Sequence, residues 1–452
     1  MPQSSIPSLR RASCSAASNS PGLDTGLYGA KNALERYLVS HPKVMLLWTM
    51  SATFGTYACM YGLRKPFTAA SFGATSDKAW FVTAQVLGYT LSKVLGIRVI
   101  AEAYARNRVK TLLFALGMAE VMLLVFAFAP LPLAGACLFL NGLSLGLVFG
   151  LVLGFVEGRQ LTEVFIAGLC ASFILADGAS KFVGAALLEH GIPERWMPVT
   201  AGALCLTPLL GFVQMLRAVP APNDLDRAER SERGPMDGAT RLAVLRQIGR
   251  PLAGVVVAYT LITVLRSLRA DFAPEIFKAL GAKPDASVFA RSELLVALAV
   301  CGVNGSLVLI RDNRRAVFVG LALCLAGLFV AAVSFRALRG QWLSPVALVV
   351  LSGVGLYVPY VAVHTTLLER MLALSCSRGN LGFLMYVADA AGYLGYMVLM
   401  VAGCGFRPGR DFLENYQTVS LLLSVGSMLA VLVSSVDVLR RPFAGPATVA
   451  RD

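Results

Sequence analysis

Twelve apolar runs, each close to the length of a membrane-crossing helix, constrain what this chain can fold into. They fall at roughly 44–66, 79–97, 111–129, 131–156, 163–188, 197–216, 251–273, 288–310, 316–335, 344–368, 380–403 and 416–439. A helix needs about 20 apolar residues to cross about 30 Å of hydrocarbon. Only 15% of the 452 residues are charged, whereas about 25% are charged in soluble globular proteins. The pattern predicts an all-α, polytopic membrane protein with twelve transmembrane helices.

The longest polar stretch between the runs separates the first six from the last six. We therefore expect two six-helix bundles, joined by a cytoplasmic linker and flanked by two cytoplasmic tails. The expected boundaries are 1–43 for a disordered tail, 44–216 for the N-terminal bundle, 217–250 for the linker, 251–439 for the C-terminal bundle and 440–452 for the second tail. The Ser- and Arg-rich start also fits an organelle targeting segment, so that alternative stays open.

The distribution of Lys and Arg predicts the orientation. If the amino terminus is cytoplasmic, the cytoplasmic segments hold 25 of these residues and the opposite segments hold 11. Cytoplasmic loops carry such an excess, so both termini are expected in the cytoplasm, in a bacterial cytoplasmic membrane. This accounts for the formal charge of +14 without nucleic acid, since no basic helix or aromatic platform stands clear of the apolar runs.

The residues that usually carry metal or redox chemistry form no motif. The nine cysteines have no paired spacing, and the three histidines, His41, His190 and His364, lie far apart. We expect no metal, no cofactor and no disulfide framework. An ATP-binding glycine loop is also missing from the sequence, and no paired acid and base suggest an enzyme.

Two faces of the expected helices match when the halves of the chain are superposed. The first face holds Tyr57, Tyr61 and Arg64, and the second, 202 residues further on, holds Tyr259, Thr263 and Arg266. Residues spaced i, i+4 and i+7 share one side of a helix. Asp177 and Asp389 match at a shift of 212. Such repeats about an axis along the membrane normal are the build of major facilitator transporters, whose binding site lies near the midplane.

Charged side chains inside the expected spans need a polar environment, because a charge facing lipid costs about 2.5–3.5 kcal/mol. They are Lys93, Lys181, Arg266, Asp177 and Asp389. Asp177 and Lys181, at i and i+4, could form a purely structural ion pair or belong to a site. Arg64 lies where the first run ends, so on its own it could be a snorkelling interfacial arginine.

The cations outnumber the acids, which favours an anionic ligand. Arg64 and Arg266, one from each half, could clamp an anion between planar guanidinium forks, with Lys93 and Lys181 as point charges. The polar walls would be Tyr57, Tyr61, Tyr259 and Tyr393. Asp177 and Asp389 would serve proton coupling or ion pairing.

Three segments resemble the organophosphate:phosphate antiporters of the major facilitator superfamily. The segment 61–67 reads Tyr-Gly-Leu-Arg-Lys-Pro-Phe, 88–96 carries Ser-Lys inside the second span, and 264–274 carries Val-Leu-Arg followed by Asp-Phe-Ala-Pro. The resemblance implies that Arg64 and Arg266 hold a substrate phosphate and that Lys93 lies beside it. The histidine of that family's fifth helix falls at about Lys181, and the usual loop motif between helices two and three is missing at 96–102.

We therefore predict a secondary active transporter that moves a small organic anion, with phosphate esters as a candidate class, across the lipid bilayer by alternating access. Its other partner would be a counter-anion or protons. The alternative is a transporter-like sensor that binds an anion without net flux. A membrane-embedded enzyme acting on lipid-linked phosphate is a third interpretation.

Overall fold

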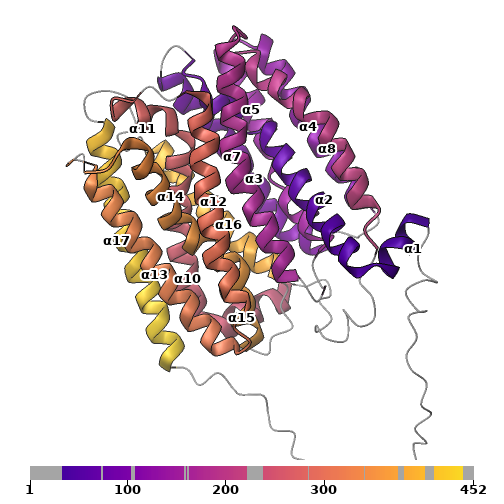
Figure 1. Ribbon diagram of the computed structural model, residues 1–452, viewed down its shortest axis with the longest axis vertical. Coiled ribbons are helices and arrows are strands. Elements are labelled where there is room, and N and C mark those ends of the chain that lie inside the picture. The colour runs from indigo at the N-terminus through magenta and orange to yellow at the C-terminus, as the bar shows by residue number, and fades with distance from the viewer. Residues whose placement is uncertain are drawn as a thin grey trace, which may run out of the picture.

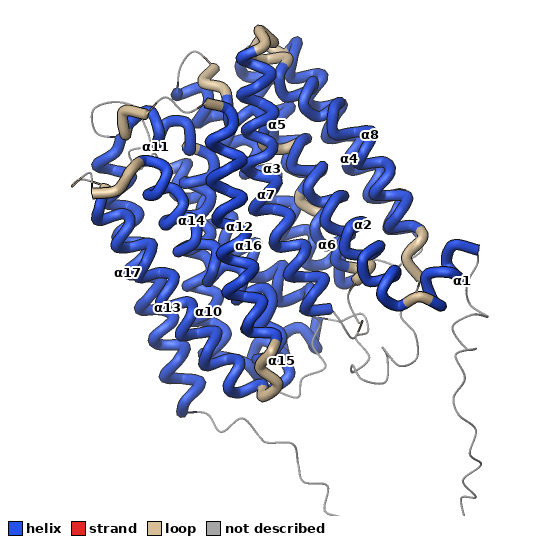
Figure 2. Tube along the Cα trace, viewed as in Figure 1, coloured by secondary structure: helices blue, strands red, loops and turns tan. Residues whose placement is uncertain are grey.

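The computed structural model describes residues 33–72, 75–102, 107–156, 159, 162–220, 238–282, 285–338, 340, 342–374, 381–402 and 412–440. The regular elements of these residues are helical (Figure 2). The first part of the chain forms α1 (Ala33–Ser40), α2 (Pro42–Gly62), the 3-10 turn η1 (Pro66–Ala69), α3 (Thr75–Glu102), α4 (Arg108–Phe128), α5 (Leu131–Leu145), α6 (Val148–Leu153), α7 (Thr162–Glu189) and α8 (Met197–Arg217). We call α2–α8 the N-terminal group.

The second part of the chain forms the C-terminal group, α10–α17. Its elements are α10 (Gly238–Asp271), α11 (Ala273–Ala279), α12 (Ala286–Val308), α13 (Asn313–Ala337), α14 (Pro345–Ala362), the π-helical turn η3 (Val363–Leu367), α15 (Leu368–Leu374), α16 (Leu381–Val401) and α17 (Phe412–Arg440). The two groups lie side by side, and α1 and the last turn of α17 lie at the same end of the bundle (Figure 1). We call this the terminus end, and the end that carries η1 and α11 the far end.

Ten helical segments of the described chain are long and apolar enough to cross a membrane. They do not include α2 and α3, which are 21 and 28 residues long and which occupy the first two expected spans. Both are more polar, because α2 buries Thr49, Thr53 and Thr56 while α3 buries Lys78 and Lys93. Large apolar side chains such as Phe114, Leu298 and Leu422 are exposed on the outer surface, as lipid contact requires.

The expected tail and linker are partly helical. Residues 33–40 form α1, in which Leu38 is fully buried, and α10 begins at Gly238 rather than at 251. Leu242, Leu245 and Ile248 recur at helical spacing there, which is a signal for a helix. The stretch 217–250 was assigned as a linker because it is rich in charged residues. The chain bends at Gly249, whose φ of 53° favours glycine, just before Pro251. The rest of the two tails and of the linker lies outside the described residues.

Small residues bring α3 and α5 close together. A Cβ on Gly142 would lie 2.1 Å from the carbonyl oxygen of Gln85, and one on Gly88 would lie 1.9 Å from the carbonyl oxygen of Phe139. Glycines allow such approach between helices in a membrane. The other face of α3 packs against α16 of the C-terminal group, so this close packing positions the contact between the groups.

Candidate anion-binding site

Arg64 is held at the end of α2 by two buried amides. The helix ends at Gly62, and the backbone N–H of Arg64 donates to the carbonyl of Tyr61 at 3.0 Å. Gln85 of α3 donates to the Arg64 carbonyl at 3.0 Å and to Asn141 of α5 at 2.9 Å. Asn141 in turn donates to the Leu63 carbonyl at 3.1 Å. These bonds satisfy the carbonyls left open at the helix end and fix the direction of the arginine.

The guanidinium groups of Arg64 and Arg266 converge on Tyr393 of α16. Arg266 of α10 donates to the Tyr393 hydroxyl at 3.2 Å, and the Arg64 Cζ atom lies 5.6 Å from the centre of the Tyr393 ring. Arg64 also lies 3.7 Å from the ring centre of Tyr89, and Arg266 lies 4.6 Å from that of Tyr360. The two arginines, one from each group, therefore lie against the same cluster of tyrosines.

Both arginines are buried, and neither has a counter-ion among the residues that the structure describes. Arg64 is 2% and Arg266 is 5% exposed. Among the described residues, neither forms an ion pair with a carboxylate, and the Nε atom of each has no hydrogen-bond partner. Aromatic faces attract guanidinium groups by about 0.5–2 kcal/mol, which is small beside the cost of burying a lone charge. The arrangement leaves donors ready for an anion.

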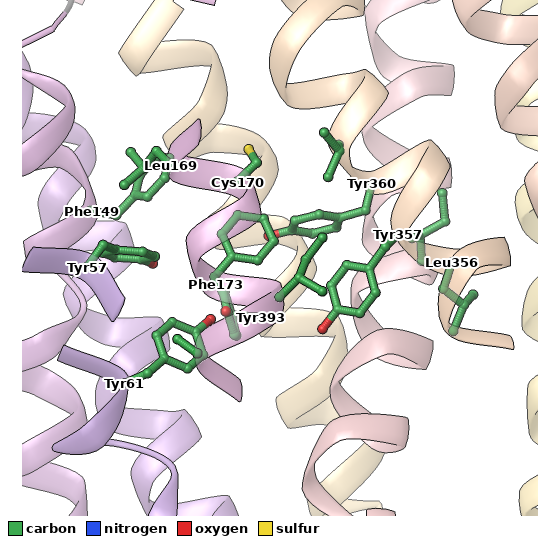
Figure 3. Packing of buried hydrophobic residues seen from close by; sticks show 14 of the residues in the cluster. Tyr57, Tyr61, Phe149, Leu169, Cys170, Phe173, Leu356, Tyr357, Tyr360 and Tyr393 are labelled. Carbon is green, nitrogen blue, oxygen red and sulfur yellow. The ribbon is translucent and has the colours of Figure 1, made fainter. Parts of the chain in front are cut away.

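Further aromatic rings pack beside these tyrosines (Figure 3). Tyr57 contacts Tyr61, with ring centres 5.7 Å apart, and Phe149 of α6, at 5.6 Å. Phe173 of α7 packs edge-on against Tyr360 of α14 at 5.4 Å. The hydroxyl of Tyr357 on α14 has no hydrogen-bond partner among the described residues. The surroundings of the arginines thus combine apolar ring faces with hydroxyl groups.

Lys93 and Asp389 connect the two groups on the side of the site that faces the terminus end. Lys93 of α3 forms an ion pair with Asp389 of α16 at 2.7 Å. The hydroxyl of Tyr259 on α10 donates to the other oxygen of Asp389 at 2.5 Å. One turn earlier in α16, the Tyr386 hydroxyl accepts from the backbone N–H of Gly150 at 2.9 Å. The terminus end is closed here by contacts between the groups.

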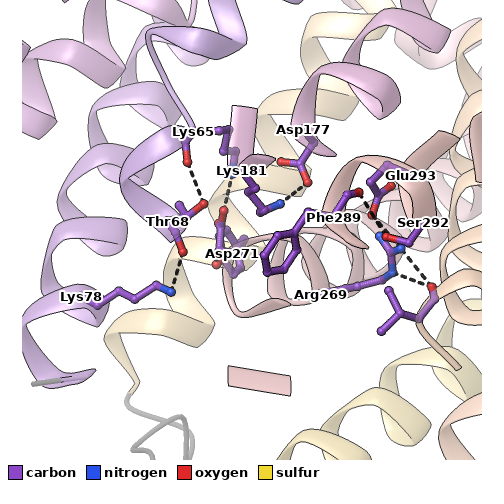
Figure 4. Close-up of polar contacts among 12 residues, drawn as sticks. Lys65, Thr68, Lys78, Asp177, Lys181, Arg269, Asp271, Phe289, Ser292 and Glu293 are labelled. Atoms are coloured by element: carbon purple, nitrogen blue, oxygen red, sulfur yellow. Dashed lines mark hydrogen bonds and ion pairs between the residues drawn. The ribbon is translucent and has the colours of Figure 1, made fainter. Parts of the chain in front are cut away.

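A second set of ion pairs connects the groups toward the far end (Figure 4). Lys65 pairs with Asp271 of α10, and the Tyr396 hydroxyl donates to Asp271 at 2.9 Å. Lys78 of α3 pairs with Glu275 of α11 at 2.6 Å. A surface pocket of about 650 Å³ lies beyond this layer and includes Glu275 in its lining. The arginines therefore lie between two layers of contacts that join the groups.

Asp177 and Lys181 form an ion pair within α7. This pair lies beside α12, where a Cβ on Gly178 would meet the Phe289 carbonyl at 2.6 Å. Figure 4 places both side chains near Asp271. The charge of Lys181 is therefore compensated within its own helix.

Several residues of the site were not singled out from the sequence. Tyr357, Tyr360 and His364 lie at i, i+3 and i+7 of the tenth expected span, so helical periodicity would have placed them on one face. Tyr89 precedes Lys93 by one turn in the same way. The ion pair between Lys65 and Asp271 joins residues that are 206 apart in the sequence, and a single sequence carries no signal for that pairing.

Solved structures of major facilitator transporters have the same fold. The structure of the MFS (major facilitator superfamily) proton:xylose symporter XylE bound to 6-bromo-6-deoxy-D-glucose matches with a TM-score of 0.61 and 14% identity, over 86% of this chain and 94% of that one. A bacterial homologue of the human drug peptide transporters PepT1 and PepT2 matches with a TM-score of 0.55 and 12% identity, over 88% and 98%. With ten apolar helices in its described residues, the chain is an integral, multi-pass membrane protein of this fold.

The chain belongs to a family of unknown function, DUF5690, whose model matches residues 66–441. No curated protein sequence matches it. The closer resemblance to organophosphate:phosphate antiporters rests on the short segments around Arg64, Lys93 and Arg266 and stays a prediction.

Proposed function

We propose that this protein is a secondary active transporter that moves a small organic anion, with phosphate esters as the favoured class. Transport would proceed by alternating access between two six-helix bundles, 44–216 and 251–439. We place the terminus end in the cytoplasm, as the Lys and Arg distribution predicts. The fold shared with known transporters supports this function, but the substrate class comes from the residues of the site.

One observation carries the anion assignment. Arg64 and Arg266 bring two buried guanidinium groups to the same tyrosine without a carboxylate partner among the described residues. Two like charges held together in a low-dielectric space repel each other. A bound phosphate or carboxylate would remove that repulsion and accept paired hydrogen bonds from each fork. The aromatic walls would cover the organic part of the substrate.

The other candidate residues either contact the substrate or hold helices together in this proposal. Tyr57, Tyr61 and Tyr393 line the space beside the arginines, and Lys93 would contact substrate once its pair with Asp389 opens. Tyr259 stays with Asp389 as part of that pair. Asp177 and Lys181 support the contact of α7 with α12.

A thermal-shift screen of the purified full-length protein tests the proposal. We expect inorganic phosphate, phenyl phosphate or benzoate to raise the melting temperature of the wild type, and Arg64→Lys or Arg266→Lys to reduce that rise strongly. A lysine keeps the charge but loses the planar fork. Uptake of the stabilising anion into proteoliposomes then separates a transporter from a sensor. Equal stabilisation of the wild type and both lysine variants would refute the anion site.

A further inference from the structure

His364 lies buried against the ion pair that joins the two groups. It is 1% exposed and belongs to the π-helical turn η3, which interrupts the helix between α14 and α15. Its Nε2 atom lies 3.5 Å from an Asp389 carboxylate oxygen and 3.4 Å from the Tyr259 hydroxyl. Such π-turns are frequent at functional sites, and nothing in the anion site described above uses this imidazole.

Hydrogen bonding determines which nitrogen of His364 carries hydrogen in the neutral ring. The Nδ1 atom lies 3.2 Å from the backbone carbonyl of Tyr360. A carbonyl only accepts, so Nδ1 must be the donor, and Nε2 then holds an unshared electron pair. The Tyr259 hydroxyl donates its hydrogen bond to Asp389 at 2.5 Å, so it does not donate to Nε2. The electron pair of Nε2 therefore faces a carboxylate oxygen with no proton between them.

The charged and titratable groups around this nitrogen come from several helices. Asp389 of α16, Tyr259 of α10 and Lys93 of α3 form the network already described. The Cys170 thiol of α7 lies within electrostatic range of the same carboxylate, and the Cys324 thiol of α13 donates to the Pro359 carbonyl. The remaining neighbours are rings, with Phe149 of α6 at 6.1 Å and Tyr360 at 4.9 Å between ring centres. Asp389 is the one carboxylate of this described cluster.

We propose that Nε2 of His364 is a proton-binding site and that a proton there releases the ion pair between Lys93 and Asp389. The proton comes from water and forms an imidazolium, while Asp389 stays a carboxylate. The carboxylate then has a cation on its own group of helices, and the imidazolium repels Lys93 on the other group. The contact that closes the terminus end weakens. The inference deepens the proposed transport function, because it names the proton as the coupling ion.

The direction of the pH effect follows from this exchange of partners. Histidine gains its charge as the pH falls from about 8 to about 5. Low pH should therefore open the terminus end, and high pH should restore the pair of Lys93 with Asp389. Lys93 and Asp389 keep their charges in both states, so the change depends on the imidazole.

Distance measurement between two spin labels tests this without any substrate. Labels at Asn107→Cys, on the N-terminal group, and Ala373→Cys, on α15, occupy exposed positions near the terminus end; the native cysteines are replaced. We expect the population with the longer distance to increase when the pH is lowered from about 8 to about 5.5. In His364→Gln protein the distribution should stay at its high-pH form at both values. Asp389→Asn should give the longer distance at both.

The other two histidines provide the matched control. In the double variant His41→Gln/His190→Gln, His364 is the one histidine that remains of the three in the sequence, and the pH response should persist. A response that survives in His364→Gln, or that disappears in the control, overturns the proposal, as does a wild type that shows no pH response. If Asp389→Asn protein does not fold, the comparison of His364→Gln with the control still decides.

The proton site and the anion site can fail separately. A protein that phenyl phosphate stabilises but that shows no pH-dependent opening retains the proposed function and loses the proton site. If opening depends on His364 but no phosphate ester or carboxylate stabilises the protein, the proton site is retained and the anion site is lost.

Discussion

Arg266 and Arg269 lie three residues apart on α10 and are both buried, but they have different partners. Arg269 pairs with Glu293 of α12 at 2.8 Å and donates to the Val349 carbonyl at 3.0 Å. Arg266 donates to a tyrosine hydroxyl and has no carboxylate partner among the described residues. An arginine therefore serves the packing of the C-terminal group at position 269, whereas at position 266 it lies among the rings of the candidate anion site.

This contrast predicts different effects of removing each arginine. Arg269→Ala would leave Glu293 buried without its partner, and breaking a buried pair costs about 3–5 kcal/mol. We expect that variant to melt at a clearly lower temperature in detergent. Arg266→Ala should melt at or above the wild-type temperature, since it removes an uncompensated charge, and should lose stabilisation by phenyl phosphate. A large loss of stability in Arg266→Ala alone would contradict the assignment.

Tyr393→Phe tests the hydroxyl that accepts from Arg266. A hydrogen bond to a charged group contributes about 1.5–3 kcal/mol, and its loss leaves the guanidinium free to turn away from the ligand. We expect anion affinity to fall at least about tenfold, measured by calorimetry with the stabilising anion. Tyr89→Phe is the control, because it keeps the ring face that lies over Arg64 and should change the affinity little. Equal losses in both variants would show that the hydroxyl of Tyr393 has no special role.

The pair of Lys65 with Asp271 should stabilise the closed far end. Lys65→Ala and Asp271→Ala each leave one buried charge alone, so both should lower the melting temperature. The swapped variant Lys65→Asp/Asp271→Lys restores opposite charges and should recover part of the loss. Melting temperatures of the wild type, the two alanine variants and their combination form a double-mutant cycle, for which we expect a coupling of about 0.5–3 kcal/mol. Additive effects of the two alanine substitutions would show that Lys65 and Asp271 do not stabilise each other.

The close approach of α3 and α5 predicts that Gly142 tolerates no larger residue. In Gly142→Ala the new methyl group would meet the Gln85 carbonyl, and overpacking costs about 1–3 kcal/mol. We expect a lower melting temperature and weaker anion binding, because Gln85 also holds Arg64. Gly117→Ala on α4 is the matched control, since a Cβ there has no neighbour within 4 Å. It should be neutral or slightly stabilising.

The sequence could predict the helical membrane fold because membrane spans leave a strong local signal. The apolar runs are continuous, and the helices α4, α13 and α17 follow the runs closely. The first two spans were predicted as well, and α2 and α3 occupy them, but these helices are not among the ten most apolar ones because they carry polar residues of the candidate site. Residues that serve a polar site weaken the very hydropathy on which the prediction depends.

For the candidate site, the sequence could suggest residue types but not contacts. The spacing of Tyr61 and Arg64 placed them on one face, and the structure brings them near Arg266 and Tyr393. The sequence did not reveal that Asp389 binds Lys93, since that pairing joins residues 296 apart. The role of His364 was hidden for the same reason, because its neighbours come from α10 and α16 as well as from its own helix.

Tyr393 and Asp389 lie one turn apart on the same side of α16, so a rise of about 6 Å along one helix separates the space beside the arginines from the carboxylate next to His364. A stiff helix cannot shift at one of these points and stay still at the other. In the proposed mechanism, a ligand that contacts Tyr393 and a proton that binds beside Asp389 would both displace α16. This one helix could therefore couple the two binding events.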